Sequence, residues 1–325
     1  MEVLLKTSYF PGPEAAPATF RRPALLVASI LLALVAAAGL AAAATFVTSW
    51  GTRGAEHGEF FSPRGVAVDA HGHVYVGDEQ NNRIQKFSGD GEFRRTWGSN
   101  GTRHGEFRYV NGVAVDEHNH VYVADIFNDR IQKFSANGEF MRAWGNEGSG
   151  EGQLDTPNGV AVDSHGHVYV ADTNHDQIQK FKTDGHFIRA WGTRGSGEGE
   201  LDRPLGVAVD PHGHVYVADT ANSRVEKFEA DGDFVRSWGE KGSSDGQLDR
   251  PNAVAVDSHG HVYVADTYNH RVDKFDAGGE YLESWGGFGT EEGRFRYPRG
   301  VAVDSRGDVY VADTSDNRIE KFSQP

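Results

Sequence analysis

From residue 44 onward, short apolar runs alternate with clusters of glycine, asparagine and aspartate, and this pattern returns every 47 residues. In the third unit the apolar runs are 159–162, 168–171, 177–181 and 187–191. They are rich in Val, Ile, Tyr, Phe and Trp, and turn-forming residues separate them, so each unit is predicted to form four β-strands. The six tryptophans of the chain share this register: Trp50, Trp97, Trp144, Trp191, Trp238 and Trp285.

Six units of four antiparallel strands predict an all-β fold, a six-bladed β-propeller. The first two runs of each unit are apolar on both faces, as expected for strands between neighbouring sheets. The first run also contains Gly and Ala and is expected nearest the axis. The third and fourth runs admit polar residues and are expected further out, where water is available. Phe187 and Trp191 are four residues apart and should share a face against the next blade.

The ends of the repeat region predict how the ring closes. The last unit stops at Phe322, after its third strand, and the missing fourth strand, 46–51, precedes the first unit. Both ends of the propeller, predicted to span 45–325, are therefore expected to share one blade, which shields sheet edges and locks the ring.

The N-terminal segment differs from the repeats. Residues 24–44 are predicted to form a transmembrane anchor or signal helix, because about 20 apolar residues can span a bilayer. Residues 1–23 are then a cytoplasmic tail, since Lys6, Arg21 and Arg22 favour that side and leave the propeller outside the cytoplasm. The apolar run is longer than that of most signal peptides, which favours an uncleaved anchor. Cleavage at its small residues would instead give a secreted protein.

Composition excludes several classes of site. The chain has no cysteine, so disulfides, zinc–thiolate sites and thiol nucleophiles are absent. Residues 1–43 hold three of the 32 basic and two of the 47 acidic residues, so residues 44–325 carry 29 and 45, a net charge of −16. Nucleic-acid-binding domains normally carry the opposite charge, and no nucleic-acid partner is predicted. The propeller is expected to be monomeric.

The repeated motifs are Pro-x-Gly-Val-Ala-Val-Asp, Val-Tyr-Val-Ala-Asp-Thr-x-Asn-x-Arg-Ile-x-Lys-Phe and Gly-x-Phe-x-x-x-Trp-Gly. With these motifs the sequence resembles the NHL repeat family over essentially all of residues 44–325. The resemblance implies a six-bladed propeller, but the family includes RNA-binding propellers, protein-binding scaffolds and zinc-dependent peptidyl-hydroxyglycine amidating lyases. The fold therefore does not decide the function.

In the lyases, the resemblance places zinc-binding histidines just after the proline that precedes the first strand. Here no histidine occupies the corresponding positions, which are Arg64, Asn111, Asn158, Leu205, Asn252 and Arg299. No metal site or cofactor is therefore predicted there, although zinc or calcium in the axial channel stays compatible with the fold.

Positions that are the same in the repeats are best explained by the blade itself. The aspartate of each Val-Ala-Asp motif, or Val-Gly-Asp in the first unit, is followed five residues later by Arg, or by Gln177 in the third unit. It is interpreted as capping a turn and pairing with that side chain, rather than as part of a functional ring of acids. Histidine pairs at five hairpins, such as His118 and His120, are interpreted as polar tips copied by duplication. Two histidines at this spacing could also bind a metal.

Positions that vary among the repeats are free to carry function. They gather where the inter-blade links and the loops between strands two and three open, here called the loop face, and loops on a rigid scaffold commonly bind ligands. Arg64 and Arg299 should adjoin there. The predicted ligand-binding residues are Arg64, Asn111, Asn158, Asn252 and Arg299 at the channel mouth, with Phe127, Asn174 and Tyr268 in the loops.

These observations predict an extracytoplasmic, membrane-tethered scaffold that binds a protein, peptide or glycan on its loop face. No catalytic residue is predicted, and a non-enzymatic role is preferred. The alternative is a metal-dependent propeller enzyme, resembling a lyase or lactonase, with its site in the axial channel.

Overall fold

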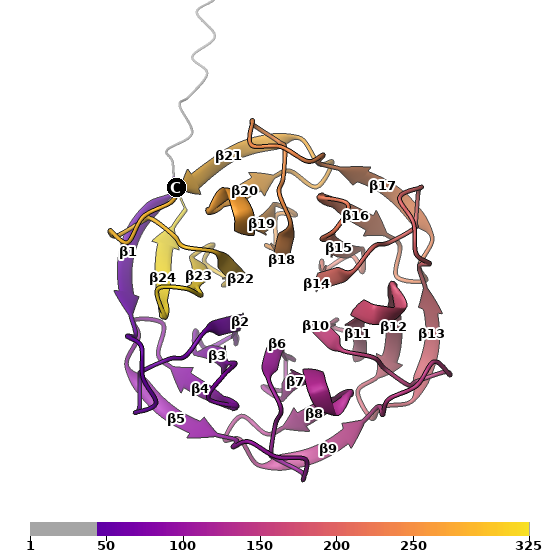
Figure 1. Ribbon diagram of the computed structural model, residues 1–325, viewed down its shortest axis with the longest axis horizontal. Coiled ribbons are helices and arrows are strands. Elements are labelled where there is room, and N and C mark those ends of the chain that lie inside the picture. Colours follow the sequence, from indigo (N-terminus) through magenta and orange to yellow (C-terminus); the bar gives the residue numbers. More distant parts are fainter. Residues whose placement is uncertain (1–43, 325) are drawn as a thin grey trace, which may run out of the picture. The chain divides into compact units, whose positions relative to one another are not determined.

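A computed structural model describes residues 44–324. In this range, 24 strands form six four-stranded antiparallel sheets, arranged as blades around a central axis (Figure 1). The predicted six-bladed propeller is confirmed. No helix among the described residues is long and apolar enough to cross a membrane. The predicted tail, 1–23, and the predicted anchor or signal helix, 24–44, lie outside the described residues, apart from Ala44.

The strands run from the axis outwards in each blade, and the blades follow one another along the chain. Blade one contains β2 (Pro63–Val68), β3 (Val74–Asp78), β4 (Arg83–Phe87) and β5 (Phe93–Trp97). Blade two contains β6 (Val110–Val115), β7 (Val121–Asp125), β8 (Arg130–Phe134) and β9 (Phe140–Trp144). Blade three contains β10 (Pro157–Val162), β11 (His167–Asp172), β12 (Gln177–Lys182) and β13 (Phe187–Trp191).

The second half of the ring repeats this order. Blade four contains β14 (Pro204–Val209), β15 (Val215–Asp219), β16 (Arg224–Phe228) and β17 (Phe234–Trp238). Blade five contains β18 (Pro251–Val256), β19 (Val262–Asp266), β20 (Arg271–Phe275) and β21 (Tyr281–Gly286). Blade six contains β22 (Pro298–Val303), β23 (Val309–Asp313), β24 (Arg318–Ser323) and β1 (Thr45–Trp50). Single 3₁₀ turns, η1 (Ile126–Asn128), η2 (Thr173–His175) and η3 (Thr267–Asn269), follow β7, β11 and β19.

Glycine lets the innermost strands approach one another at the axis. A Cβ added to Gly112 in β6 would lie 2.3 Å from the carbonyl oxygen of Asn158 in β10. One added to Gly65 in β2 would lie 1.9 Å from the carbonyl oxygen of Asn111. Such distances exclude a larger side chain without backbone movement, so the small residues of the first strand follow from its place in the ring, as predicted.

The ring closes as the sequence predicts. β1 pairs antiparallel with β24, with Trp50 opposite Ile319 and Phe46 opposite Phe322. In Figure 1 the indigo first strand lies beside the yellow last strand. The first and last segments of the propeller therefore share blade six, and neither leaves an inner strand edge open.

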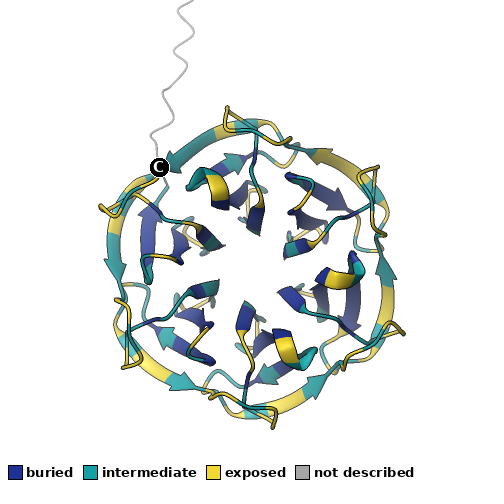
Figure 2. Ribbon diagram, in the orientation of Figure 1, coloured by how far each residue is buried: buried dark blue, intermediate teal, exposed yellow. Residues whose placement is uncertain are grey.

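Aromatic side chains fasten each blade to the next, and the inner three strands are largely buried (Figure 2). The ring of Trp144 in β9 lies 6.1 Å from that of Phe181 in blade three. The expectation that Phe187 and Trp191 share a face was wrong. Phe187 packs on Phe181 of its own blade, whereas Trp191 packs on Phe228 of blade four. A β-bulge between β12 and β13 inserts one residue and reverses the alternation.

The third strand differs from its prediction as well. Its middle polar residue was expected near water, but it is almost completely buried in every blade: Gln85, Gln132, Gln179, Glu226, Asp273 and Glu320. In blade two, the Gln132 amide accepts a bond from Gly105 N at 2.9 Å and donates to Glu106 O at 2.8 Å. The side chain is buried because it satisfies backbone groups of the inter-blade link.

Blades four to six place an acid where blades one to three place an amide. Burial raises the pKa of Glu226 to about 8, that of Asp273 to about 8 and that of Glu320 to about 7, although a neighbouring arginine opposes each shift. The folded state therefore disfavours ionisation of these acids, although Arg224 Nη2 lies 2.6 Å from Glu226 Oε1 and Arg318 Nη2 lies 2.6 Å from Glu320 Oε1.

We expect the Glu226→Gln/Glu320→Gln variant to remove part of the pH dependence of folding. A folded-state pKa above the unfolded value gives stability that is complete below about pH 4.5 and is lost as pH rises through 7 to 8. The variant should gain roughly 1–3 kcal/mol over the parent between pH 5 and pH 9. Urea unfolding across this range measures the difference in free energy of unfolding between parent and variant. The reverse change, Gln132→Glu, should make the protein less stable than the parent as pH rises. Parallel profiles for parent and variant would contradict the assignment.

Candidate ligand site on the loop face

A buried aspartate holds each loop of the loop face in place. Asp125 Oδ1 accepts a bond from Arg108 N at 2.7 Å, and its Oδ2 accepts one from Arg130 Nε at 2.7 Å. Arg130 also donates to three carbonyls of the preceding link. Burial raises the pKa of Asp125, and these donors oppose the shift. The predicted pairing with arginine is confirmed, but the predicted cap is not: Asp125 makes no cap bond to the following turn and instead accepts from a backbone N–H of the link.

A set of variable residues that the sequence analysis missed lies beside these loops. Each precedes the first strand of its blade and has a left-handed backbone, with φ between 51° and 63°: Ser62, Tyr109, Thr156, Arg203, Arg250 and Tyr297. Backbone N–H groups of this set donate to side chains of the preceding blade, as Arg203 does to Asp176 Oδ1 at 2.7 Å. A non-glycine residue in this conformation is strained and needs such support. Their variation beside a nearly constant proline was the signal in the sequence.

Three predicted asparagines lie buried at the channel mouth. Asn111 Nδ2 donates to Asn158 Oδ1 at 2.6 Å, which joins blades two and three. Asn158 Nδ2 donates in turn to Thr156 O at 3.0 Å and to Thr173 Oγ1 at 2.8 Å. Asn111 and Asn158 therefore serve the contact between blades, while Asn252 makes no side-chain hydrogen bond within residues 44–324.

The two predicted arginines adjoin, as expected. Arg64 Nε lies 2.8 Å from Glu79 Oε1. Burial lowers the pKa of Arg64, Glu79 opposes that shift, and the neighbouring charge of Arg299 adds to it. Arg299 Nε is buried and has no hydrogen-bond partner within residues 44–324. Arg64 thus pairs with Glu79 of its own blade, and the charge of Arg299 also acts on Glu79, opposing the rise in its pKa that burial causes.

A cavity of about 360 Å³ opens between blades four and five on this face. Its charged lining consists of four cations and one carboxylate: Arg203, Lys241, Arg250, Arg299 and Asp249. The Arg250 guanidinium stacks 5.0 Å above the ring of Tyr268, which also lines the cavity. None of the four cations has an ion-pair partner among the described residues. In a propeller of net charge −16, these four cations make a local concentration of positive charge.

Exposed aromatic side chains flank the channel mouth in two clusters. Tyr109 and Phe127 make an edge contact at 5.0 Å in blade two. Tyr268 and Tyr297 lie 5.5 Å apart between blades five and six, and Phe288 beside them is 69% exposed. Exposed aromatic clusters of this kind are typical of binding surfaces.

The structure therefore divides the predicted set. It brings Asn252, Arg299 and Tyr268 together in the cavity between blades four and five. Phe127 belongs to the separate aromatic cluster of blade two. Asn174 is exposed in blade three and donates to Asp155 Oδ1 at 2.9 Å.

The axial channel itself holds a small cavity of about 60 Å³. Its lining is mostly glycine, valine and alanine of the innermost strands, together with Asn111, Leu205, Asn252 and Arg299. Neither a histidine nor a carboxylate lines it within the described part of the chain. The histidine and carboxylate groups that usually bind zinc are thus missing from this cavity.

Comparison with known proteins agrees with this architecture. The NHL repeat matches five segments of the chain: 60–87, 154–181, 201–228, 248–275 and 295–322. This is an NHL-repeat protein. The second repeat, which has Val110 where the others have proline, lies outside the matched segments and still forms the same four strands.

The similarity to individual proteins is more limited. A stretch of 46 residues is 46% identical to protein wech of Drosophila melanogaster and covers 14% of this chain but only 6% of that protein. A protein of unknown function from Bacteroides thetaiotaomicron has a TM-score of 0.67 at 19% identity, covering 86% of this chain and 76% of that one.

A streptogramin B lyase has a TM-score of 0.60 at 13% identity, covering 87% of this chain and 98% of that one. A virginiamycin B lyase from Staphylococcus aureus has a TM-score of 0.56 at 11% identity, covering 80% of each chain. At these identities the likeness shows the fold alone.

The buried asparagines can be tested for a structural role. We expect Asn158→Ala to lower the free energy of unfolding by about 1–3 kcal/mol, because it leaves the buried Asn111 Nδ2 without its acceptor, whereas Thr173 keeps its bond to Pro204 O. Asn252→Ala, the matched variant in blade five, should lower the free energy of unfolding by less than about 0.5 kcal/mol. Chemical denaturation of both variants measures this difference, and equal losses would contradict it.

Proposed function

We propose that this NHL-repeat protein is an extracytoplasmic, membrane-tethered scaffold that binds a protein, peptide or glycan on its loop face. The observation that carries the proposal is the cationic cavity between blades four and five, next to exposed Tyr268 and Tyr297. A ligand there would meet fixed guanidinium groups and aromatic rings on a rigid frame. Such a surface binds with little loss of conformational entropy.

The non-enzymatic role is preferred to the metal-dependent one on the basis of the axial channel. Metal-assisted catalysis needs convergent ligands and an open coordination position. The channel lining supplies small apolar residues and amides instead. The two lyases among the similar structures share the fold at 11–13% identity, which supports no transfer of their activity.

Binding can be tested with arrays of acidic and neutral glycans and with a peptide library, using the full-length chain. We expect a probe that binds the parent to lose at least tenfold in affinity, about 1.4 kcal/mol, in the Arg203→Ala/Arg250→Ala variant. The control variant, Arg94→Ala/Arg189→Ala, removes the same charge from outer strands and should change affinity less than twofold. Equal binding by all three proteins would contradict a site in this cavity.

The tether can be tested by cell fractionation. We expect the full-length chain to sediment with membranes and to resist a carbonate wash, because residues 24–44 are apolar enough to span a bilayer. Protease added to intact cells should digest the propeller. A mature N-terminus near residue 44 would show that the chain is secreted, and a soluble cytoplasmic protein would contradict both forms.

A further inference from the structure

The end of the propeller opposite the loop face carries a ring of similar hairpins. They join the first and second strands of each blade, and five of the six read Asp-x-His-x-His, beginning at Asp69, Asp116, Asp163, Asp210 and Asp257. Blade six has Arg306 and Asp308 at the histidine positions. These groups lie on the other side of the molecule from the cavity described above.

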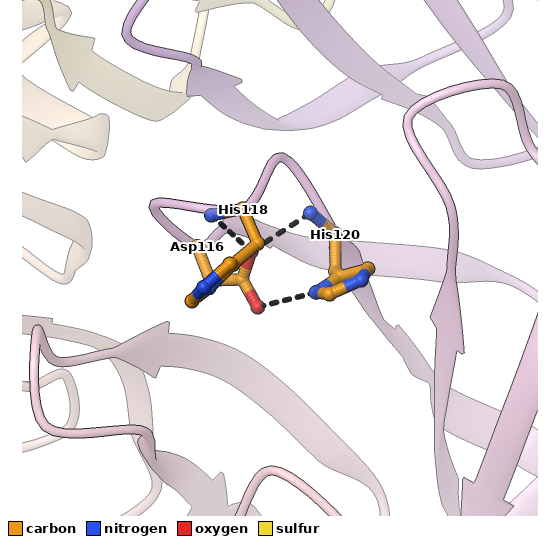
Figure 3. Close-up of side chains that lie close together, drawn as sticks. All are labelled: Asp116, His118 and His120. Carbon is orange, nitrogen blue, oxygen red and sulfur yellow. Dashed lines mark hydrogen bonds and ion pairs between the residues drawn. The ribbon is translucent and has the colours of Figure 1, made fainter.

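In blade two the aspartate orients the second histidine (Figure 3). Asp116 Oδ1 accepts bonds from the backbone N–H groups of His118 and His120, at 2.9 and 2.8 Å. Asp116 Oδ2 lies 2.8 Å from His120 Nδ1 and also accepts a bond from Tyr122. A carboxylate only accepts, so His120 carries its proton on Nδ1 and leaves Nε2 free to bind a cation.

The first histidine of the pair lies within reach of the same cation. One ligand atom from each of Asp116, His118 and His120 lies within 4.8 Å of the others, and the same holds for Asp257, His259 and His261. The His118 and His120 rings are 5.9 Å apart and nearly parallel. A cleft of about 310 Å³, lined also by Asp163 and His165 of the next hairpin, leaves room for water around a bound ion.

Blade six shows that this position suits a positive charge. Where histidine is missing, Arg306 Nη2 lies 2.9 Å from Asp304 Oδ2, the equivalent of Asp116. The guanidinium stands where His118 stands in blade two, where Lys133 Nζ also lies 3.9 Å from Asp116 Oδ2. The net charge of −16 on residues 44–325 favours a cation further.

We propose that the hairpins of blades two and five each bind a divalent transition-metal ion such as Zn²⁺, Cu²⁺ or Ni²⁺. His118 and His120 are the ligands in blade two, and His259 and His261 are those in blade five. Imidazole nitrogen suits these metals, whereas Ca²⁺ and Mg²⁺ prefer oxygen ligands. Asp116 and Asp257 orient the second histidine of each pair, as carboxylates commonly do behind metal-bound imidazole.

The test titrates ZnCl₂ into the full-length chain, prepared without a histidine tag or a chelating column, with calorimetry and elemental analysis after dialysis. We expect at least two Zn²⁺ per chain with micromolar dissociation constants, and no heat from CaCl₂. His118→Ala/His259→Ala should lose two equivalents, while His186→Ala, which removes an exposed histidine elsewhere, should lose none. An unchanged stoichiometry in the double variant would overturn the proposal, as would binding of Ca²⁺ with equal strength.

A second variant separates orientation from folding. Asp116→Asn/Asp257→Asn keeps the shape of the side chain and should weaken the two sites roughly 10- to 100-fold. Circular dichroism must show unchanged strand content for this comparison. Affinity equal to that of the parent would contradict the orienting role, and Cu²⁺ absorption bands lost only in the histidine variant would support nitrogen ligation.

Discussion

The buried carboxylate at the end of each second strand is the interaction on which the loop face depends. Asp125 has no exposed surface, so its charge is stable only because a backbone N–H, Asn128, Arg130 and Gln132 all donate to it. Removing one donor would leave a buried charge incompletely satisfied, which costs more than an ordinary surface contact. Repeated in each blade, this arrangement joins every link to the next blade and fixes where the variable residues stand.

Blade three shows how far that arrangement tolerates change. Asp172 meets Gln177 and His175 in place of arginine and asparagine, at 2.8 Å each. The geometry survives because any donor of similar reach satisfies the carboxylate. In the third strand, the amide of Gln132 and the acid of Glu320 both accept a backbone N–H of the link, from Gly105 and Gly293. The blade constrains hydrogen-bond donors more strongly than it constrains charge.

The sequence predicts the propeller, its closure and the pairing of the repeated aspartate with arginine, since these follow from periodicity and turn chemistry. It does not predict the bulge that puts Phe187 and Trp191 on opposite faces, because two apolar residues four apart look the same in the sequence with or without a bulge between them. Nor does it predict that Gln132 is buried, since burial depends on a link distant in the chain. At the site, Arg299 and Tyr268 were correctly expected on one face. Arg203 and Arg250 were missed, although their variation beside a nearly constant proline marks them, because the sequence does not show that the left-handed backbone places them beside the loops.

The two ends of the propeller show different relations between repetition and chemistry. On the loop face the repeats differ, so a single cavity between blades four and five acquires four cations and a tyrosine. At the opposite end the repeats agree, and the same Asp-x-His-x-His hairpin recurs around the ring. Differences among the repeats can create one site of a particular shape. Identical repeats can instead present the same two imidazoles and orienting carboxylate in several blades. The two regions share no residue, because the largely buried inner strands lie between them.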